Sequence, residues 1–189
     1  MATEVQSKRR NRAMLIGLFA VAFVPLFAAY LLYQESRSAE PWATTNRGEL
    51  MKPIVSVAEL GLIPNDPAHS QTLSMSASGH WWLVTVANGA CESECQSALH
   101  QLRQLHVLLG KDADRIKRAL VEQGVDEPEA ALSESYPEVG WFGGPVNALT
   151  PGVYIIDPLG NVVLRYPYGD AGKPVLEDLK KLLKVSHIG

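Results

Sequence analysis

The sequence predicts an α/β sandwich that follows one membrane-spanning helix. Three observations lead to this prediction: an uncharged apolar run near the N-terminus, a later apolar run of aromatic and β-branched residues, and a turn-linked pair of strands between two amphipathic segments. The 189 residues are 47% hydrophobic, with 15 Gly and 12 Pro, which is ordinary globular usage and excludes collagen-like or low-complexity chains.

The apolar run covers residues 13–33 and predicts a transmembrane helix. At about 1.5 Å per residue it makes a helix of about 31 Å, which matches the hydrocarbon core of a membrane. Pro25 lies inside the run, where a local kink accommodates it. A cleaved signal peptide is the alternative, but its apolar region is only about 7–15 residues long. No A-x-A site follows the run, so we expect a retained anchor.

Flanking charges predict the orientation of this anchor. The basic residues that precede it are Lys8, Arg9, Arg10 and Arg12. Such an excess is typical of the cytoplasmic side, so we expect residues 1–12 in the cytoplasm and the C-terminal domain in the periplasm. The protein is then a single-pass protein of a bacterial inner (cytoplasmic) membrane. Residues 34–50 are polar and predict a tether, and residues 51–189 predict a soluble domain without a second spanning run.

The first half of the domain predicts two strands with a helix between them. Trp81–Val86 consists mainly of aromatic and β-branched residues, which is typical of a buried strand. Apolar residues then recur three and four positions apart over Glu92–Leu109, which predicts an amphipathic helix. Gly110 is suited to end that helix, and Ile116–Val121 predicts a second strand.

The second half predicts a strand hairpin and a closing helix. Residues 124–151 mix acidic residues, Gly and Pro, and predict a long excursion with one short helix. Val153–Ile156 and Val162–Tyr166 predict two strands joined by the turn Asp157–Asn161. Pro174–Val185 predicts a helix with Pro in its first turn and lysines near its end. The order β, α, β, excursion, β-hairpin, α is that of a thioredoxin-like α/β sandwich.

Cys91 and Cys95 are the only cysteines and lie where the buried strand passes into the helix. Amide groups at a helix N-terminus stabilise a thiolate, although Glu92 and Glu94 between the cysteines oppose this. The four-residue offset places both sulfurs on one helix face, within reach of a disulfide or of one soft metal ion. We expect a redox or metal-binding pair. A structural disulfide is the alternative, which so short a loop disfavours.

Composition and motifs exclude several function classes. The net charge of −3 argues against a protein that binds nucleic acid, which needs a basic face. Two cysteines are too few for a disulfide scaffold or a four-thiolate zinc site. The glycines at residues 143–144 are not followed by the Lys-Ser/Thr pair of a phosphate-binding loop.

The stretch from Trp82 to Val121, with CESEC, the helix after it and DADRIKRALV, resembles the Sco/SenC family. The tail that begins YIIDPLGNVV is similar to that family's YLIDP-x-G hairpin and last helix. Members are membrane-anchored, copper-binding proteins of thioredoxin fold that serve the dinuclear copper site of cytochrome c oxidase. The resemblance implies copper as cofactor or cargo. It implies cytochrome c oxidase, or its copper-site subunit, as partner.

Two positions near the hairpin bear on this resemblance. Family members carry a copper-binding His eight residues before the Asp of the hairpin, and counting back from Asp157 gives Leu149. Pro151 lies six residues before Asp157, where thioredoxin-like thiol reductases have a cis-proline that faces the cysteines. The resemblance implies a catalytic Pro151, with a cis or an ordinary trans bond after Thr150. Distance or a different helix face leads us to expect that none of four histidines replaces the missing ligand: His80, His100, His106 and His187.

The sequence thus predicts a membrane-anchored thioredoxin-like protein that assists cytochrome c oxidase assembly. It would act by thiol–disulfide exchange, as a thiol–disulfide oxidoreductase, or by Cu(I) handling at Cys91 and Cys95. In exchange we expect Cys91, as the more N-terminal and more exposed cysteine, to attack and Cys95 to resolve. The alternative is a non-catalytic oxidase-associated subunit or scaffold with a structural disulfide.

Overall fold

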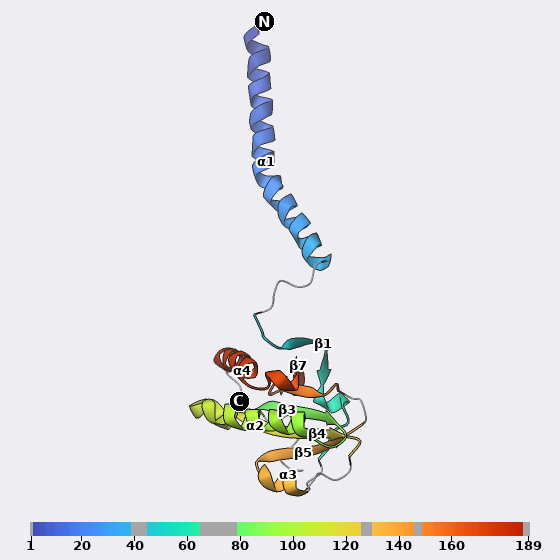
Figure 1. The fold of residues 1–189 in the computed structure, drawn as a ribbon. Coiled ribbons are helices and arrows are strands. Elements are labelled where there is room, and N and C mark those ends of the chain that lie inside the picture. The colour runs from blue at the N-terminus through green and yellow to red at the C-terminus, as the bar shows by residue number, and fades with distance from the viewer. Residues whose placement is uncertain (1, 39–44, 65–78, 126–129, 146–148, 187–189) are drawn as a thin grey trace. The chain divides into compact units, whose positions relative to one another are not determined.

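The computed structural model divides into two units: Met1–Thr45 contains one long helix, and Asn46–Gly189 holds a sheet with helices (Figure 1). The residues that the structure describes are 2–38, 45–64, 79–125, 130–145 and 149–186.

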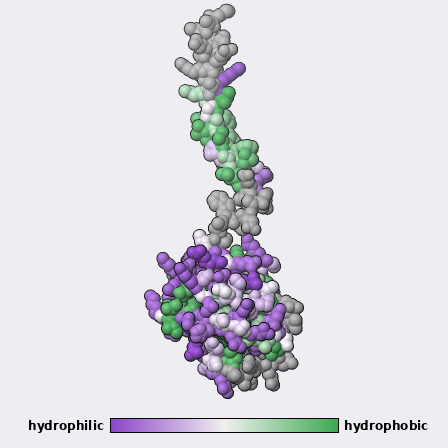
Figure 2. All heavy atoms as spheres, viewed as in Figure 1, coloured by the Kyte–Doolittle hydropathy of each residue, from purple (hydrophilic) through white to green (hydrophobic). Residues whose placement is uncertain are grey.

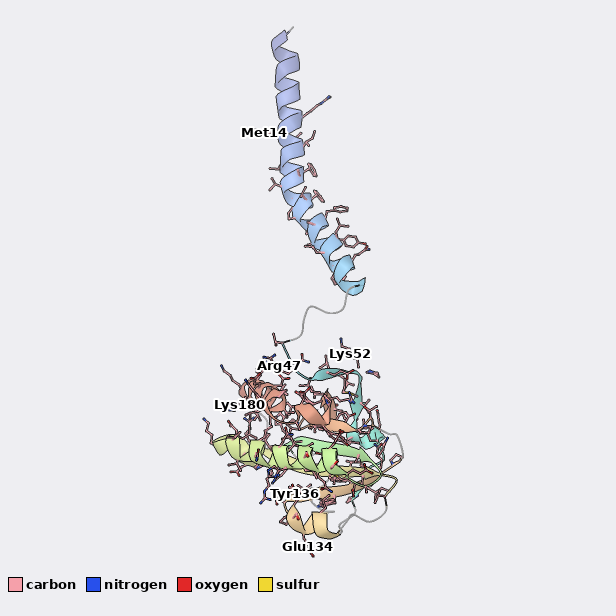
Figure 3. The ribbon with its side chains drawn as sticks, in the orientation of Figure 1. Met14, Arg47, Lys52, Glu134, Tyr136 and Lys180 are labelled. Atoms are coloured by element: carbon pink, nitrogen blue, oxygen red, sulfur yellow. A yellow bond between two sulfur atoms is a disulfide. The ribbon has the colours of Figure 1, made fainter. Side chains whose placement is uncertain are left out.

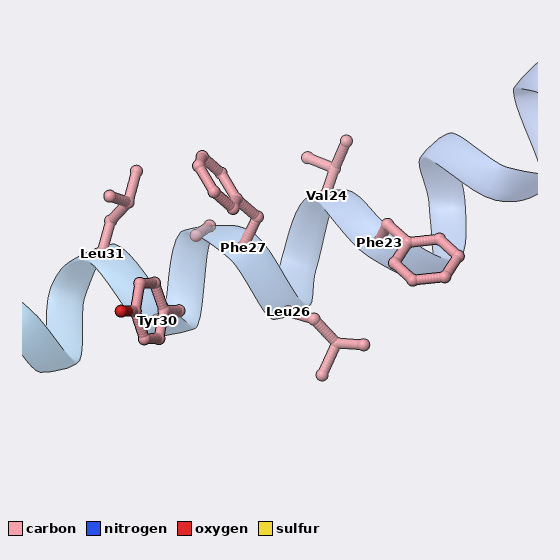
Figure 4. A pocket seen from close by; sticks show the side chains of 7 residues that line it. Phe23, Val24, Leu26, Phe27, Tyr30 and Leu31 are labelled. Carbon is pink, nitrogen blue, oxygen red and sulfur yellow. The ribbon is translucent and has the colours of Figure 1, made fainter.

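Helix α1, Ala2–Ser38, contains the apolar run. Its segment Met14–Gln34 is long and apolar enough to cross a membrane, and none of it is buried against protein. The helix bends along its length (Figure 1), as expected for Pro25, which removes one intrahelical hydrogen bond. Apolar and aromatic side chains point outward around this part of the helix (Figure 4), which is the most hydrophobic surface in Figure 2. The predicted apolar helix is confirmed, and it extends beyond residues 13–33 at both ends.

A seven-stranded mixed sheet forms the centre of the second unit, in the order β1-β7-β6-β3-β4-β5-β2 over the described residues. Strands β3, β4 and β5 are parallel, whereas β6, β7, β1 and β2 each run antiparallel to a neighbour. The strands are β1 Glu49–Ser56, β2 Ile63–Pro64, β3 Trp81–Asn88, β4 Ile116–Gln123, β5 Val139–Gly144, β6 Gly152–Ile156 and β7 Asn161–Tyr166.

Two helices cover one face of this sheet. Leu102 of α2 and Leu179 of α4 pack with Leu83 of β3 in one buried cluster. The amphipathic pattern of both helices explains this packing, because their apolar positions recur at helical spacing. The helices of the unit are α2 Ser93–Leu108, α3 Ala130–Ser135 and α4 Lys173–Val185, with the 3-10 turns η1 Val57–Glu59, η2 Gly110–Arg115 and η3 Tyr168–Asp170.

Short segments cover the opposite face. Val57 of η1 and Leu149 pack there against Val84 and Val121, which lie on β3 and β4. The alternation along β3 separates the two faces: Leu83 contacts the helices, whereas Val84 contacts the short segments. Both faces are therefore buried, as the continuous apolar run of β3 predicted.

The predicted thioredoxin-like sandwich is confirmed, but three strands were not predicted. The sequence placed the residues of strand β5 in the excursion, because glycines are atypical of strands. Pairing with β4 nevertheless holds these residues in a strand. Strand β2 also forms only by pairing with β5. The second unit begins at Asn46 and β1 at Glu49, within the stretch 34–50 for which the sequence predicts a tether.

Asp178 on α4 fixes the start of the second unit. Its carboxylate, 2% exposed, accepts the N–H groups of Arg47 at 2.5 Å and Gly48 at 3.1 Å. It also accepts the hydroxyl of Tyr166 at 2.9 Å and the ammonium of Lys181 at 3.2 Å. Burial alone would raise the pKa of Asp178, but the hydrogen bonds from these four partners outweigh burial and lower it.

We expect Asp178→Asn to lower the free energy of unfolding by about 1–3 kcal/mol near neutral pH, because the amide leaves buried donors unpaired. The pKa of Asp178 in the folded state lies below its ordinary value of 3.8. The ionised carboxylate therefore stabilises the fold above that pH, and this stabilisation is lost as the pH falls through the folded pKa. Urea unfolding of the full chain in an uncharged detergent, followed by tryptophan fluorescence at neutral and acid pH, measures both effects.

The matched control is Asp170→Asn, because Asp170 is an exposed carboxylate on η3. Equal losses of stability in the two variants would contradict the role given to Asp178.

Candidate disulfide site

Cys91 and Cys95 form a disulfide at the carboxyl end of β3, with Cα atoms 5.3 Å apart. The turn after β3 needs a positive φ, which Gly89 supplies at +82°. The Gly89 N–H donates to the carbonyl of Gln123 at 2.9 Å, so the end of β4 sets the direction of the turn. The turn delivers Cys91 to the N-terminus of α2, and Cys95 is the third residue of that helix. The C-x-x-x-C spacing thus joins the two sulfurs as the sequence suggested.

Both cysteines are buried, and each is only 3% exposed. They pack with Leu99 of α2, Leu120 of β4 and Trp141 of β5 in one cluster. The expectation that Cys91 is the more exposed of the two is therefore wrong. The physical reason is that Cys91, like Cys95, packs in this core cluster. The main chain of Cys91 is also hydrogen-bonded to neighbouring side chains at both its N–H and its carbonyl.

Glu122 makes the first of these hydrogen bonds. Its Oε1 accepts the Cys91 N–H at 2.8 Å, while the Cys91 carbonyl accepts from the Gln96 side chain at 2.9 Å. Glu122 is 2% exposed and lies one residue from the end of β4. Burial of a carboxylate is costly, so its presence here identifies Glu122 as a positioning residue for the cysteine turn. Sequence reasoning missed it, although a lone acidic residue in an apolar strand was the available signal.

A pocket of about 330 Å³ opens beside the disulfide. Cys95 forms part of its wall and Cys91 does not. Pro151 lies in the same wall, so the structure brings Cys95 and Pro151 together. The remaining lining residues are Ala87, Asn88, Ala90, Glu92, Ser93, Glu94 and Tyr168.

The Thr150–Pro151 bond is trans. Among the described residues the cis peptide bond is Lys52–Pro53, so the cis alternative for Pro151 is wrong. Trans is the ordinary state of such bonds, and local hydrogen bonds are compatible with it here. The Tyr154 hydroxyl donates to the carbonyl of Thr150 at 2.7 Å, and Arg165 donates to the carbonyl of Pro151 at 3.1 Å.

Tyr168 supplies a neutral hydroxyl to the pocket. It donates to the carbonyl of Val86 at 2.5 Å, which ties η3 to β3. Burial raises the pKa of Tyr168 to about 12, with smaller contributions from Tyr154 and from the charge of Glu94. The hydroxyl therefore stays protonated in the physiological range.

Leu149 occupies the position at which the Sco/SenC pattern has a copper-binding His. It is 7% exposed and packs against Val86 and Phe142. The side chain of Gln123 holds its main chain, donating to the Leu149 carbonyl at 2.8 Å and accepting its N–H at 2.9 Å. Leu149 is therefore a core residue, and its position provides no metal ligand.

The described histidines do not replace this ligand. His100 is exposed and contacts Gln104 at 3.0 Å, and His80 precedes β3 at the end away from the cysteines. His106 lies near the far end of α2, where burial and the charge of Arg118 lower its pKa. His187 falls outside the described residues. In the described part of the chain no three His, Cys, Asp or Glu side chains are grouped to hold a metal ion. The residues present do not fit a three-ligand copper site.

Comparisons with known proteins agree with this fold. Residues 81–186 match the model of a family described as a transmembrane-like, thioredoxin-like, C-terminal domain. No curated protein matches the sequence.

Solved structures of Sco proteins are similar in fold. Apo Sco1 from Thermus thermophilus has a TM-score of 0.52 at 17% identity, over 74% of this chain and 98% of that one. BsSco, a member of the Sco family of cytochrome c oxidase assembly proteins, has a TM-score of 0.44 at 11% identity, over 76% and 98%. Copper-bound ScoI from Bradyrhizobium japonicum has a TM-score of 0.40 at 16% identity, over 55% and 85%. The match to apo Sco1 from Thermus thermophilus confirms the Sco/SenC resemblance seen in the sequence as a similarity of fold.

We expect Glu122→Ala to lower the free energy of unfolding by about 1–3 kcal/mol, because the buried Cys91 N–H loses its acceptor. Amide hydrogen exchange at Cys91 should accelerate in parallel. Glu122→Gln is the matched control, since its carbonyl oxygen can accept the same hydrogen bond. Wild-type exchange at Cys91 in the alanine variant would contradict the positioning role.

We expect the reduced chain to hold no Cu(II) through desalting, because two thiolates without an imidazole form a poor Cu(II) site. Visible absorption from sulfur-to-copper charge transfer measures this, with the Cys91→Ser/Cys95→Ser double variant as the blank. A stable band in the wild-type protein would contradict the conclusion that Leu149 leaves the ligand set incomplete.

Proposed function

The chain belongs to the family of transmembrane-like, thioredoxin-like C-terminal domains, and from this premise we propose that it is a membrane-anchored thiol–disulfide exchange protein of cytochrome c oxidase assembly. The observation that carries the proposal is the Cys91–Cys95 disulfide at a strand–helix junction, with Cys95 in the wall of a pocket. A pair at a helix N-terminus is placed to exchange, because the helix stabilises the thiolate that must leave.

The pocket makes Cys95 the sulfur that a partner reaches. A partner thiolate attacks Sγ of Cys95, a mixed disulfide forms, and the Cys91–Cys95 bond breaks. Cys91 leaves as a thiolate and takes up a proton. The partner's second thiolate then attacks the partner sulfur of the mixed disulfide, and Cys95 leaves and is protonated. Two electrons pass from the partner dithiol to the pair, and the reverse reaction uses the same steps. This assignment reverses the roles expected from chain order.

Sequence features support both the membrane location and the oxidase partner. The anchor over 13–33 and its basic flank support a single pass through a bacterial inner membrane, with the domain of residues 51–189 in the periplasm. The CESEC and YIIDP motifs, together with the Sco1-like fold, support the copper-site subunit of the oxidase as the partner. Its cysteines would be the substrates. Cu(I) would be cargo between two thiolates of the reduced pair.

Burial favours a second candidate, a structural disulfide in a non-catalytic oxidase-associated subunit. Each cysteine is 3% exposed and lies in a core cluster, as inert structural cysteines do. The two candidates differ in the reduction potential of the pair. A structural disulfide has a potential below about −300 mV, whereas exchanging pairs have higher values.

We expect the reduction potential of Cys91–Cys95 to lie above about −300 mV, within the range of exchanging pairs. Equilibration of the full chain in dithiothreitol buffers, followed by thiol alkylation and mass measurement, gives the value. Trp141 packs in the same cluster as both cysteines, so its fluorescence is a second readout. In a deletion strain, the Cys91→Ser/Cys95→Ser variant should fail to restore oxidase activity. Full restoration together with a lower potential would favour the structural disulfide.

We expect the two single variants to differ in reactivity toward the neutral reagent 2,2′-dithiodipyridine. Cys91→Ser leaves Cys95 beside the pocket, so it should form the mixed disulfide several-fold faster than Cys95→Ser, whose Cys91 does not line the pocket. Absorbance of the released thiopyridone measures both rates. Faster reaction of the Cys95→Ser variant would return the attacking role to Cys91.

A further inference from the structure

Two carboxylates stand at the mouth of the pocket beside Cys95. Glu92 and Glu94 both line it, and both are exposed. Glu92 is the N-cap residue of α2, yet its side chain makes no capping hydrogen bond. In the described part of the chain no ion pair joins either glutamate to a basic side chain. Their charges therefore act on whatever enters the pocket.

The rest of the lining does not compensate these charges. Tyr168 is protonated, and the other lining side chains are neutral. Arg165 is the basic residue that approaches this wall, through its hydrogen bond to the Pro151 carbonyl at 3.1 Å. Its guanidinium is already paired with Glu49 at 3.2 Å. The mouth of the pocket is consequently negative, and the disulfide lies behind it.

The attacking species in exchange is itself an anion. A thiolate that approaches Cys95 passes the two glutamates, and like charges a few ångströms apart repel each other even in water. A positive group next to the reacting sulfur of the partner reverses the sign of this interaction. Electrostatic selection of this kind acts mainly on the rate of encounter and is weakened by salt.

We propose that the pocket selects partners that carry positive charge beside the reacting cysteine, such as a protein segment with Lys or Arg next to its thiol, and disfavours anionic thiols. The inference rests on the proposed function and names the substrate class of the same site. The reaction is the exchange given above: the partner sulfur bonds to Cys95, the Cys91–Cys95 bond breaks, and two electrons and two protons end on the pair. No further oxidant or reductant is needed.

Three small thiols of different charge test this selection. Cysteamine carries an ammonium group, 2-mercaptoethanol is neutral and 3-mercaptopropionate carries a carboxylate. The rate constant for reduction of the full chain in an uncharged detergent is measured for each, per thiolate. Each of these rate constants is divided by the rate constant with which the same thiol reduces the neutral reference bis(2-hydroxyethyl) disulfide. We expect cysteamine to exceed 3-mercaptopropionate by about tenfold at low ionic strength, and the ratio to shrink toward one in molar salt.

Matched variants separate the two glutamates from the overall charge of the protein. Glu92→Gln/Glu94→Gln should bring the ratio close to one. Glu59→Gln/Glu134→Gln is the control, since it removes the same charge from two exposed sites on η1 and α3 and should keep the wild-type ratio. Glu134 of α3 is labelled in Figure 3. Cysteamine and 3-mercaptopropionate reducing the wild-type protein at equal normalised rates would overturn the inference, as would an unchanged ratio in Glu92→Gln/Glu94→Gln. If none of the three thiols reduces the native protein, both the proposed function and the charge selection fail. If all three reduce it without a charge preference, only the charge selection fails.

Discussion

The parallel pairing of β3 with β4 is the constraint on which the rest of the site depends. The two strands pair in register from Trp81 with Ile116 to Asn88 with Gln123, so they end together. Where β3 ends, the chain must turn and start α2, and the end of β4 holds this turn through the carbonyl of Gln123. Any slip in this register would move the cysteine turn away from Glu122, because a one-residue shift sends each side chain to the other face.

Adjacent residues at the end of β4 serve opposite faces of the sheet. Glu122 points to the helix face and holds the main chain of Cys91, whereas Gln123 points to the other face and holds that of Leu149. One strand end thus organises both the disulfide and the segment that leads to Pro151. The same arrangement explains the departure from a copper-binding pattern, since Leu149 is anchored in the core with its main chain satisfied. Among the described residues, nothing at this strand end adds a third ligand to the two cysteines.

Local patterns were sufficient for much of the fold. The continuous apolar run of β3, the periodicity of α2 and the turn after Ile156 each describe their own element, so the sequence predicted them within a few residues. Strands β1 and β5 were missed for a shared reason. Their own residues include Pro53 or several glycines, which disfavour strands, and pairing with β7 and β4 outweighs that preference.

By itself the sequence determined that an apolar helix precedes a thioredoxin-like domain and that two cysteines meet at a strand–helix junction, because composition, periodicity and short spacings are local properties. Tertiary structure alone decided that both sulfurs are buried, that Cys95 borders the pocket with Pro151, and that the Pro151 bond is trans. It also recruited Glu122 to Cys91 across 31 residues and Tyr168 to Val86 across 82. Contacts between such distant residues arise only when the sheet forms, so no local pattern could encode them.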